Sequence, residues 1–469
     1  MFRLFNRRKP ARRVLVLGLD CASPHLLFQQ FTDDLPHLRR LMQGGTYGVL
    51  QSSIPCITVP AWSSMLSSRD AGVLGVYGFR NRADYSYDAL TIADNRALQH
   101  PRLWDILAEQ DKQSLILNVP QTYPVRPMAG HLVSGFLTPG TGAQFAYPAI
   151  FKQEVLKHMP DYAFDVRDFR HIDRAQLYQR IIDVTDVQYQ LLEHALTHKA
   201  WDFAMHVNIG VDRIHHAYWR YHDPEHRLHD PDSPYRHAIR DYYKRVDTWI
   251  GRILNVIDDQ TAVLVVSDHG AKRMDGAIAI NQWLYDAGWL SLKQTPPRVT
   301  AFSHEMVDWA HTRAWSTGGY YGRIFLNVCG REPQGIIAPE DYEAVRDDLA
   351  AQLRAIPDDT GTPLPDTQVF KPQAIYRQVN NIAPDLMVYF GDLHWRVVGS
   401  VGYEQHYTLE NDTGPDDANH AEEGVYILYD PRQAGRGAGE TRHLMDIAPT
   451  VLNLMNCPIP ADMQGASLI

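Results

Sequence analysis

The chain has 469 residues, of which 45% are hydrophobic and 21% are charged. This composition is typical of a globular protein and excludes the fibrous and low-complexity classes. Lysine and arginine number 45 and aspartate and glutamate 55, so the formal net charge is −10. That balance argues against a protein that coats nucleic acid, which would carry a basic face. A small anionic substrate remains compatible with it, because a bound metal ion reverses the potential of an acidic pocket.

Targeting features are sparse in the sequence. No apolar stretch reaches the roughly 18 residues of a membrane-spanning helix, and residues 1–12 form a basic segment that we expect to be a solvated tail. The cysteines lie far apart and form no CxxC pair, at Cys21, Cys56, Cys329 and Cys457. This spacing argues against a disulfide framework or a cysteine zinc site and favours a reducing, cytoplasmic location.

Short β-type runs alternate with segments of helical periodicity along the chain. The pattern predicts an α/β fold with a largely parallel central sheet covered by helices. The clearest strands are expected over residues 14–19, 114–118, 203–209, 262–267, 386–390 and 425–429. Their continuous apolar character is typical of strands buried on both faces. Apolar residues repeat at intervals of three and four between Ile239 and Ile257, which predicts a helix leading into strand 262–267.

Two regions fit the sheet pattern poorly, at about residues 120–175 and about residues 290–380. We expect both to be insertions that act as lids over one edge of the sheet. The rest of residues 13–469 is expected to form a single catalytic domain.

Polar side chains follow two of the expected strands directly. Asp20 comes after strand 14–19, and Asp268 with His269 comes after strand 262–267. Sites in parallel α/β sheets form where the carboxyl ends of the strands open into loops. An aspartate beside a histidine offers the mixed oxygen and nitrogen donors that zinc or manganese accepts. The alternatives are a helix cap for Asp20 and a simple turn for Asp268.

Two further segments carry metal-ligand types. Asp212 and His216 follow strand 203–209 at a spacing of four, which places both side chains on one face of a helical turn. His420 lies just before strand 425–429, and on its own it is equally compatible with an ordinary loop histidine. Together with Asp20, Asp268 and His269 these residues provide three aspartates and three histidines, enough for two divalent metal ions.

Thr58, in the segment SIPCITVPAWSSM, is the candidate nucleophile. It is expected near a helix N-cap with Pro60 in the first turn. A hydroxyl there faces unpaired backbone N–H groups, which suits a phosphoryl group, and a metal ion would favour its deprotonated form. The alternative is that Thr58 is an ordinary capping residue.

The order of the candidate residues along the chain resembles that of the alkaline phosphatase superfamily, and within it the type I phosphodiesterase/nucleotide pyrophosphatase group. This order is Asp20, Thr58, Asp212-x-x-x-His216, Asp268-His269 and His420. Several sequence motifs are most similar to those of its branch of predicted phosphohydrolases and phosphomutases. The likeness runs from about residue 13 to the C-terminus. It is carried by TVPAWSSM, SGFLTP, VDRIHHAYW, SDHGAKRMDGAIAINQWL, GREPQG, APDLMVYF and DIAPTVLNLMNCPIPADMQG.

This resemblance implies a three-layer α/β sandwich with lid insertions and assigns roles to the site residues. It implies one metal ion held by Asp20, Thr58, Asp268 and His269, and a second held by Asp212, His216 and His420. Thr58 would be the nucleophile. Zn²⁺ is the favoured metal, with Mn²⁺ as the alternative.

Two departures from related patterns bear on specificity. Nucleotide pyrophosphatases typically place an asparagine three residues after the nucleophile, where this chain has Ala61. Asn208 and Asn281 are therefore proposed as phosphoryl-oxygen contacts in its place. Sulfatases carry a Cys or Ser followed by x-Pro-x-Arg, whereas Cys56 is followed by Ile57 and Thr58, which argues against a sulfatase.

The function expected from the sequence is a two-metal phosphohydrolase of phosphodiesterase or nucleotide pyrophosphatase type. It would act on a small phosphorylated substrate through a phosphothreonine intermediate. A phosphomutase would use the same metals and nucleophile, but would return the phosphoryl group to the substrate. A scaffold that binds metal without catalysis is the alternative from another class.

Overall fold

A computed structural model describes the chain from Arg12 to Ile469. The expected basic tail therefore lies outside the described residues, except for Arg12, which pairs with Asp430. Within the described range, none of the helices combines the length and the apolar content that a membrane crossing requires.

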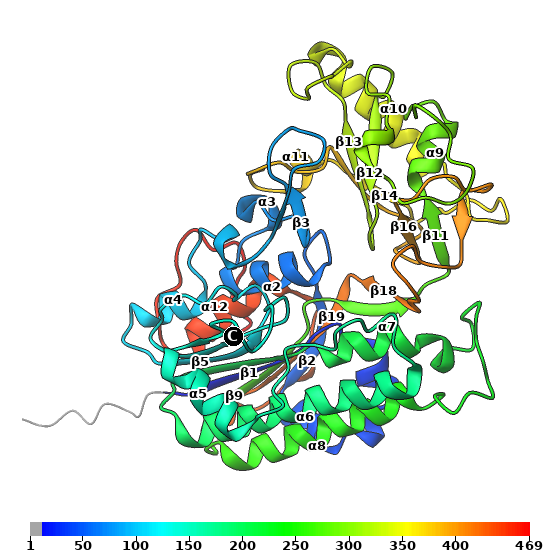
Figure 1. Ribbon diagram of the computed structural model, residues 1–469. Coiled ribbons are helices and arrows are strands. Elements are labelled where there is room, and N and C mark those ends of the chain that lie inside the picture. The colour runs from blue at the N-terminus through cyan, green and yellow to red at the C-terminus, as the bar shows by residue number, and fades with distance from the viewer. Residues whose placement is uncertain (1–11) are drawn as a thin grey trace, which may run out of the picture.

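A mixed sheet of ten strands forms the centre of the molecule (Figure 1). Its strands are β1 (Val14–Leu19), β2 (Thr46–Gln51), β5 (Ser114–Val119), β6 (Gly130–Ser134), β7 (Ala146–Tyr147), β8 (Phe203–Asn208), β9 (Ala262–Val266), β19 (Glu423–Tyr429), β20 (Gly437–Ala438) and β21 (Arg442–His443). Strands β9, β1, β8, β5 and β6 are neighbours and run parallel, whereas β19 runs antiparallel to both β2 and β9. The α/β fold with a mostly parallel sheet, predicted from the sequence, is thus confirmed.

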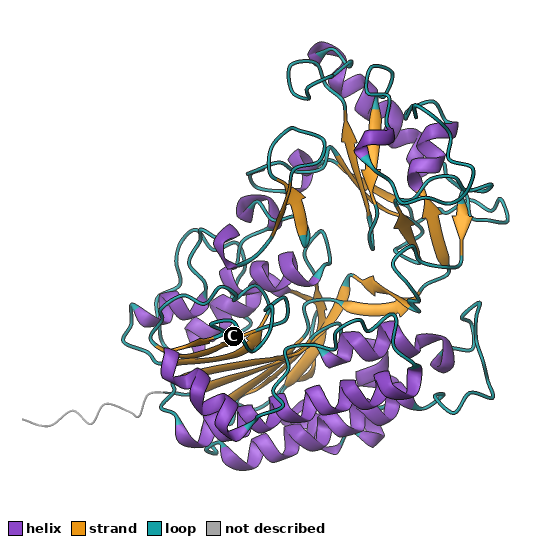
Figure 2. Ribbon diagram, viewed as in Figure 1, coloured by secondary structure: helices purple, strands orange, loops and turns teal. Residues whose placement is uncertain are grey.

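Helices cover both faces of this sheet, giving three layers (Figure 2). On one face lie α1 (Pro36–Gly44), α6 (Arg174–His198), α7 (Gly210–His222) and α8 (Ala238–Val256), and on the other lie α2 (Thr58–Ser67), α4 (Leu103–Ala108) and α12 (Ile447–Leu454). The alternation along β1 explains the arrangement. Leu15 and Leu17 pack into the core under the first group of helices, and Val14 and Val16 pack into the core under the second.

A second part of the chain, which we call the cap, spans residues 274–417 and has its own hydrophobic core (Figure 1). It contains a three-stranded sheet, β11 (Gly276–Ala279), β16 (Trp395–Val398) and β17 (Tyr407–Thr408), and a four-stranded antiparallel sheet, β12 (Ala314–Thr317), β13 (Gly322–Leu326), β14 (Gln368–Phe370) and β15 (Leu386–Tyr389). Its helices are α9 (Ile280–Asp286), α10 (Tyr342–Arg354) and α11 (Pro372–Ile375).

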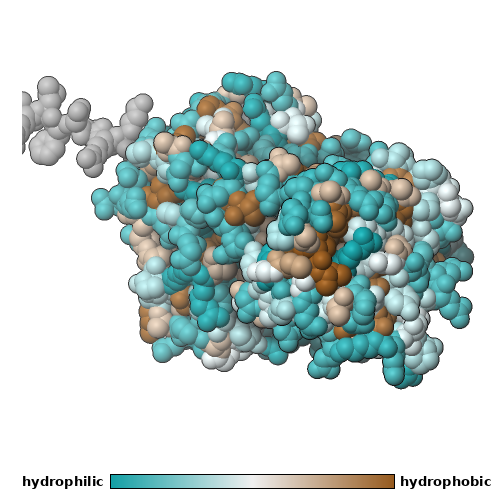
Figure 3. All heavy atoms as spheres, turned by 90° about the horizontal axis from the view of Figure 1, so that it is seen from above, coloured by the Kyte–Doolittle hydropathy of each residue, from teal (hydrophilic) through white to brown (hydrophobic). Residues whose placement is uncertain are grey.

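Seen from above, the molecule is mainly hydrophilic, with hydrophobic side chains in small groups (Figure 3).

One two-stranded ribbon leads into the cap and back. The chain leaves the main sheet through β10 (Gly270–Arg273) and returns through β18 (Ala418–Ala421), and the two strands pair antiparallel. A second small hairpin, β3 (Arg80–Arg82) with β4 (Leu90–Ile92), follows α3 (Ala71–Leu74). The expected lid at about residues 290–380 falls inside the cap.

Two features differ from the sequence expectation. The strand expected over residues 386–390 exists as β15, but it belongs to the cap and pairs antiparallel, because an apolar run indicates burial without indicating which sheet buries it. The region at about residues 120–175, expected as an insertion, contributes β6 and β7 to the main sheet before α5 (Ala149–His158). The division into tail, catalytic domain and lids stays a prediction.

His206, in the middle of β8, gives this fold a specific sensitivity to acid. Its ring is buried and meets Tyr189 edge-on, and neither ring nitrogen has a hydrogen-bond partner within residues 12–469. Burial lowers the pKa of His206 from 6.5 to about 3. The unfolded chain therefore takes up a proton below pH 6.5 that the folded protein does not, and stability is lost as the pH falls from there towards 3.

We predict that His206→Leu makes the protein less sensitive to acid. From pH 7 to about pH 5 the variant should lose about 2 kcal/mol less unfolding free energy than the wild type, at about 1.4 kcal/mol per pH unit below the unfolded pKa. Denaturant titrations at both pH values measure this difference. His25→Leu, at an exposed histidine whose ring contacts the neutral side-chain amide of Gln29, serves as the control and should show the wild-type slope. Equal slopes for wild type and His206→Leu would contradict the prediction.

Candidate metal centre

The site forms where the carboxyl ends of neighbouring parallel strands meet. Strand β1 lies between β8 and β9, and Gly18 is in register with Val207 and Val266. Asp20 follows β1 and Asp268 follows β9, so the register brings both carboxylates to the same edge of the sheet. Both side chains are completely buried.

Each of these carboxylates is held by a dedicated contact. The indole Nε1 of Trp62 on α2 donates to Asp20 Oδ2 at 2.7 Å. Gly18 allows this approach, because a Cβ at that position would lie 2.6 Å from the Trp62 ring. Cys21 has a left-handed backbone (φ +68°), and its N–H donates to Asp268 Oδ1 at 3.2 Å. One oxygen of each carboxylate is thereby fixed and the other is left for a different partner.

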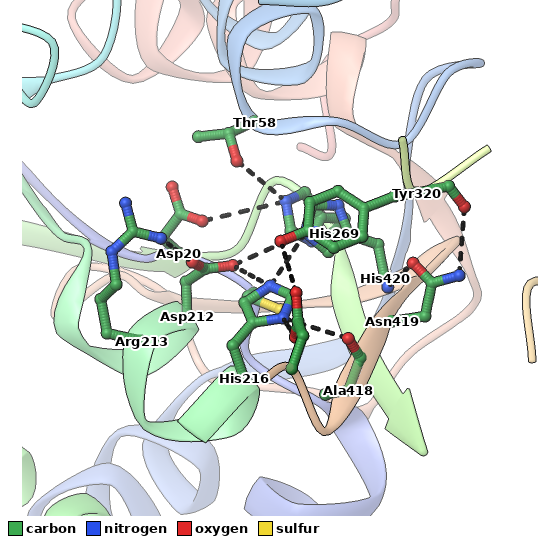
Figure 4. Close-up of polar contacts among 12 residues, drawn as sticks. Asp20, Thr58, Asp212, Arg213, His216, His269, Tyr320, Ala418, Asn419 and His420 are labelled. Atoms are coloured by element: carbon green, nitrogen blue, oxygen red, sulfur yellow. Dashed lines mark hydrogen bonds and ion pairs between the residues drawn. The ribbon is translucent and has the colours of Figure 1, made fainter. Parts of the chain in front are cut away.

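The first ligand group comprises Asp20, Asp268, His269 and Thr58, of which Asp20, His269 and Thr58 are labelled in Figure 4. His269 Nε2 lies 3.1 Å from Asp268 Oδ2, 3.8 Å from Asp20 Oδ1 and 3.3 Å from Thr58 Oγ1. The other ring nitrogen of His269, Nδ1, lies 3.1 Å from the carbonyl oxygen of Gly270, which accepts its hydrogen bond. Nε2 is therefore the nitrogen that faces the group and is available as a ligand.

The second ligand group comprises Asp212, His216 and His420. The Nε2 atoms of His216 and His420 lie 3.1 Å and 3.6 Å from Asp212 Oδ1. The two Nε2 atoms are 3.3 Å apart. The rings of His420 and His269 stack at 3.8 Å between centroids, so the two groups adjoin.

His420 reaches the site through strand pairing rather than through a loop. It lies in β18, where it is in register with Ala271 of β10, the strand that follows His269. The carbonyl oxygen of Cys56 lies 2.9 Å from His420 Nδ1 and leaves Nε2 facing Asp212. The alternative of an ordinary loop histidine does not describe this residue, whose side chain is buried.

Thr58 is the first residue of α2, and the N-cap position belongs to Ile57. The hydroxyl of Thr58 caps no backbone N–H, so the alternative interpretation of an N-capping threonine is wrong. Pro60 lies in the first turn, where its missing N–H costs nothing. The buried hydroxyl instead lies beside His269 at the positive end of the helix.

The electrostatics of these side chains fit bound cations, except at His216. Burial alone would lower the pKa of His216, but Asp416, Tyr320 and Asp212 raise it well above its usual value. Within the two groups, three buried carboxylate oxygens accept no hydrogen bond from the described residues: Asp20 Oδ1, Asp212 Oδ1 and Asp268 Oδ2. Burial and the neighbouring carboxylates raise the pKa values of Asp20 and Asp268, so these anions are costly without a cation. Burial lowers the pKa of His269 to about 4 and that of His420 well below its usual value, which keeps both imidazoles neutral, the form that binds metal.

The donor atoms form three sets that could each hold a metal ion, and the third set shares one histidine with each of the other two. They are Asp20, Asp268, His269; Asp212, His216, His420; and Cys21, His269, His420. The Cys21 thiol donates to the carbonyl oxygen of Gly270 at 3.3 Å, and burial raises its pKa, so it stays protonated. The buried Asp and His groups are consistent with a bimetallic site.

Sequence reasoning missed two residues that hold the second group in place. Asp416 Oδ1 accepts a hydrogen bond from His216 Nδ1 at 2.7 Å. Asp416 Oδ2 accepts one from the hydroxyl of Tyr320 at 3.2 Å, and the Tyr320 ring stacks on His420 at 4.3 Å (Figure 4). Asp416 stands four residues before His420 in DDANH, a signal that could have been read. Tyr320 comes from the cap hairpin between β12 and β13 and carries no such signal.

The side chains of the two asparagines proposed as substrate contacts have other hydrogen-bond partners. Asn281 is buried in the cap. Its side-chain amide forms hydrogen bonds with the backbone of Ser316 and Gly399, and these bonds leave little capacity for a substrate contact. Asn208 Oδ1 accepts from the N–H of Gly210 and from the hydroxyl of Tyr242. Neither asparagine is among the residues that line the pocket above the ligand groups.

That pocket has a volume of about 570 Å³ and lies between the main sheet and the cap. Thr58, Asp212 and His420 form part of its wall from one side, and Tyr320, Arg323 and Arg396 do so from the cap. A small molecule placed there would touch Thr58, residues of both ligand groups and the cap.

The sheet and its site identify the class, an alkaline-phosphatase-like α/β protein. The chain belongs to the type I phosphodiesterase/nucleotide pyrophosphatase family, whose profile matches residues 14–416. No curated protein matches the chain significantly.

Solved structures of the same fold support this class at low sequence identity. Phosphonoacetate hydrolase from Sinorhizobium meliloti, in complex with phosphonoformate, has a TM-score of 0.61 and 14% identity over 96% of each chain. An inactive threonine-to-alanine variant of murine ectonucleotide pyrophosphatase/phosphodiesterase 5, in complex with AMP, has a TM-score of 0.54 and 12% identity over 96% of each chain. The human protein of that name has a TM-score of 0.54 and 13% identity over 97% of each chain.

We predict that Asp416→Asn weakens metal binding at the second ligand group by about 10- to 100-fold, because His216 loses the carboxylate that orients its ring and raises its basicity. Calorimetric titration of metal-free protein with Zn²⁺ measures the effect. The matched control is Asp417→Asn, since Asp417 is also buried but pairs with Arg220 instead of a ligand side chain. Unchanged affinity in Asp416→Asn, or equal losses in both variants, would remove the orienting role from Asp416.

Proposed function

We propose that this protein is a metal-dependent phosphohydrolase of the phosphodiesterase or nucleotide pyrophosphatase type, with Thr58 as its nucleophile. The observation that carries the proposal is the position of the Thr58 hydroxyl. It lies at the start of α2, 3.3 Å from His269 Nε2, on the wall of the pocket and beside both ligand groups.

The two ligand groups would each hold a divalent ion. Asp20, Asp268, His269 and Thr58 would hold one, and Asp212, His216 and His420 would hold the other. Mixed nitrogen and oxygen donors favour Zn²⁺, with Mn²⁺ as the alternative. When bound, such ions lower the pKa of a ligating hydroxyl and neutralise charge that develops on phosphoryl oxygens.

The residues of the chain then account for the transfer itself. Thr58 Oγ1 loses its proton to solvent and attacks phosphorus. The bond to the leaving oxygen breaks as the Thr58–phosphorus bond forms, and the leaving oxygen takes up a proton from solvent. The N-terminus of α2 directs its positive end towards the phosphoryl group. A water molecule then attacks the phosphothreonine, which releases the phosphoryl product and restores the hydroxyl.

Arg213 and Ala61 bear on how the phosphoryl oxygens are held. Ala61 has no side-chain donor, so the asparagine contact of nucleotide pyrophosphatases is missing here. Arg213 lines the pocket, and its guanidinium donates to Asp212 Oδ2 and to both oxygens of Asp165. We propose that Arg213 provides a positive charge next to the second ligand group.

Two of the structural neighbours support a phosphorus-containing substrate. One was solved with AMP in a variant that was inactive after a threonine was changed to alanine, and the other with phosphonoformate. Both carry the same fold over almost the full length of the present chain. A hydroxyl nucleophile and a phosphate or phosphonate ligand are thus compatible with this architecture.

Thr58→Ala is predicted to lower kcat by several orders of magnitude while the protein stays folded, because the attacking oxygen is gone. Thr58 caps no helix, so no capping energy is lost. Turnover of a panel of phosphodiesters, phosphoanhydrides and phosphomonoesters measures the effect, with circular dichroism as a check on folding. Thr58→Ser keeps a hydroxyl and should retain far more activity than Thr58→Ala. A Thr58→Ala variant with more than about a tenth of the wild-type kcat, a barrier change below roughly 1.4 kcal/mol, would exclude Thr58 as the nucleophile.

Chelation is predicted to abolish turnover and also to lower the thermal unfolding temperature. The second effect follows because three buried carboxylates lose the cations that compensate them, and because a ligand bound to the folded state stabilises it. Adding Zn²⁺ or Mn²⁺ should restore both properties. Full activity and an unchanged melting curve in metal-free protein would contradict the proposal.

A further inference from the structure

The pocket above the ligand groups is strongly cationic, although the chain as a whole carries a net charge of −10. Six arginines line it: Arg80, Arg167, Arg170, Arg213, Arg323 and Arg396. Its wall contains three carboxylates, Asp165, Asp168 and Asp212. The arginines come from separate segments of the main part of the chain and of the cap, and folding brings them together around one pocket.

Three of these arginines already have carboxylate partners. Arg213 pairs with Asp165 and Asp212. Arg170 and Arg396 share Asp416, which lies behind the wall, at 2.7 Å and 3.2 Å. Their charge is therefore largely compensated within the protein.

The other three, Arg80, Arg167 and Arg323, form no ion pair with any residue that the structure describes. Arg323 donates to the carbonyl oxygens of Arg80 and Gly318 at 2.8 Å and 3.3 Å. Arg167 donates to the carbonyl oxygen of Pro139 at 2.6 Å. Neutral carbonyl groups therefore hold two of these guanidinium groups in position without cancelling their charge.

The location of Arg80 and Arg323 separates these two unpaired arginines from the metal centre. A second pocket of about 480 Å³ adjoins the first, and the residues that line both are Arg80, Gly318, Gly319, Arg323, Arg396 and Thr413. Thr58, Asp212 and His420 line the first pocket but not the second. Arg80 and Arg323 thus stand at the boundary, beyond the place where a phosphoryl group would meet Thr58.

We propose that the substrate carries a second anionic group, a phosphate or a carboxylate, remote from the phosphoryl group that is transferred. This inference rests on the proposed function and narrows its substrate class. Arg80 and Arg323 bind the second anion, since guanidinium groups match both carboxylate and phosphate geometry, and Arg167 adds positive charge on the wall of the first pocket. A substrate whose far end is uncharged leaves this charge uncompensated and binds less well.

Binding of simple probes to metal-loaded protein tests the proposal without requiring turnover. Propylphosphonate carries one anionic group. Alkyl bisphosphonates and phosphonocarboxylates with spacers of increasing length carry two. We expect the best two-anion probe to bind at least about 10-fold more tightly than propylphosphonate at low salt, about 1.4 kcal/mol. The preference should shrink as salt is added, because Arg80 and Arg167 are exposed and therefore screened.

Variants assign the preference to the arginines. Arg80→Gln and Arg323→Gln should each reduce it, and together abolish it, with propylphosphonate binding unchanged. Arg80 is exposed, so its variant remains informative even if Arg323→Gln disturbs the backbone that Arg323 holds. Arg180→Gln, at an exposed position on α6 outside both pockets, is the matched control and should change nothing.

Equal binding of one-anion and two-anion probes at every spacer length would overturn the inference. So would a preference that survives in the double variant Arg80→Gln/Arg323→Gln. The comparison of bisphosphonates with phosphonocarboxylates shows which anion is preferred. An arginine-dependent preference in a protein that hydrolyses none of the phosphoester panel would count against the proposed function alone.

Discussion

Three buried carboxylates converge at one edge of the central sheet, and the rest of the site is arranged around the cost of that convergence. Asp20, Asp212 and Asp268 each leave one oxygen without a hydrogen bond among the described residues. Isolated anions in such a place are unfavourable, because burial removes the water that would solvate them. Cations bound between the carboxylates and the imidazoles would compensate the buried negative charge. The parallel register of β1 and β9 brings Asp20 and Asp268 to the same edge of the sheet, and α7, which follows β8, adds Asp212.

The cap and the metal centre depend on each other through one short ribbon. β10 follows His269 out of the sheet and β18 brings His420 back, so the chain between these two histidines forms the cap. Asp416 and Tyr320 then fix the histidines of the second ligand group from the cap side. A change in the position of the cap would therefore reach the ligands directly. In the proposed function, the same segment supplies the walls that select the substrate.

The strand ends and the polar side chains that follow them could be predicted from the sequence because local pattern determines them. Strands β1 and β9 are continuous apolar runs, and a polar residue directly after such a run falls at the edge of the sheet. The spacing of Asp212 and His216 likewise follows from helix geometry. The role of Thr58 does not follow from local pattern, because threonine at a helix start is usually a cap. The fold places its hydroxyl beside His269.

Other parts of the site depend on contacts between residues distant in sequence, which local pattern does not specify. Tyr320 is an ordinary tyrosine in a hairpin loop until the cap places its ring on His420. The arginines of the pocket are scattered from residue 80 to residue 396, and their convergence is a property of the folded chain. For the same reason the apolar run of β15 indicated a strand correctly and its sheet wrongly.

The central claim is that two ligand groups, which share no residue, hold two cations beside Thr58. The most direct measurement is anomalous diffraction from crystals of the protein loaded with Zn²⁺. The account predicts two separate peaks, one within coordination distance of Asp20, Thr58, Asp268 and His269, and one within that distance of Asp212, His216 and His420. A single peak shared by all of these residues, or no peak in fully loaded protein, would contradict it.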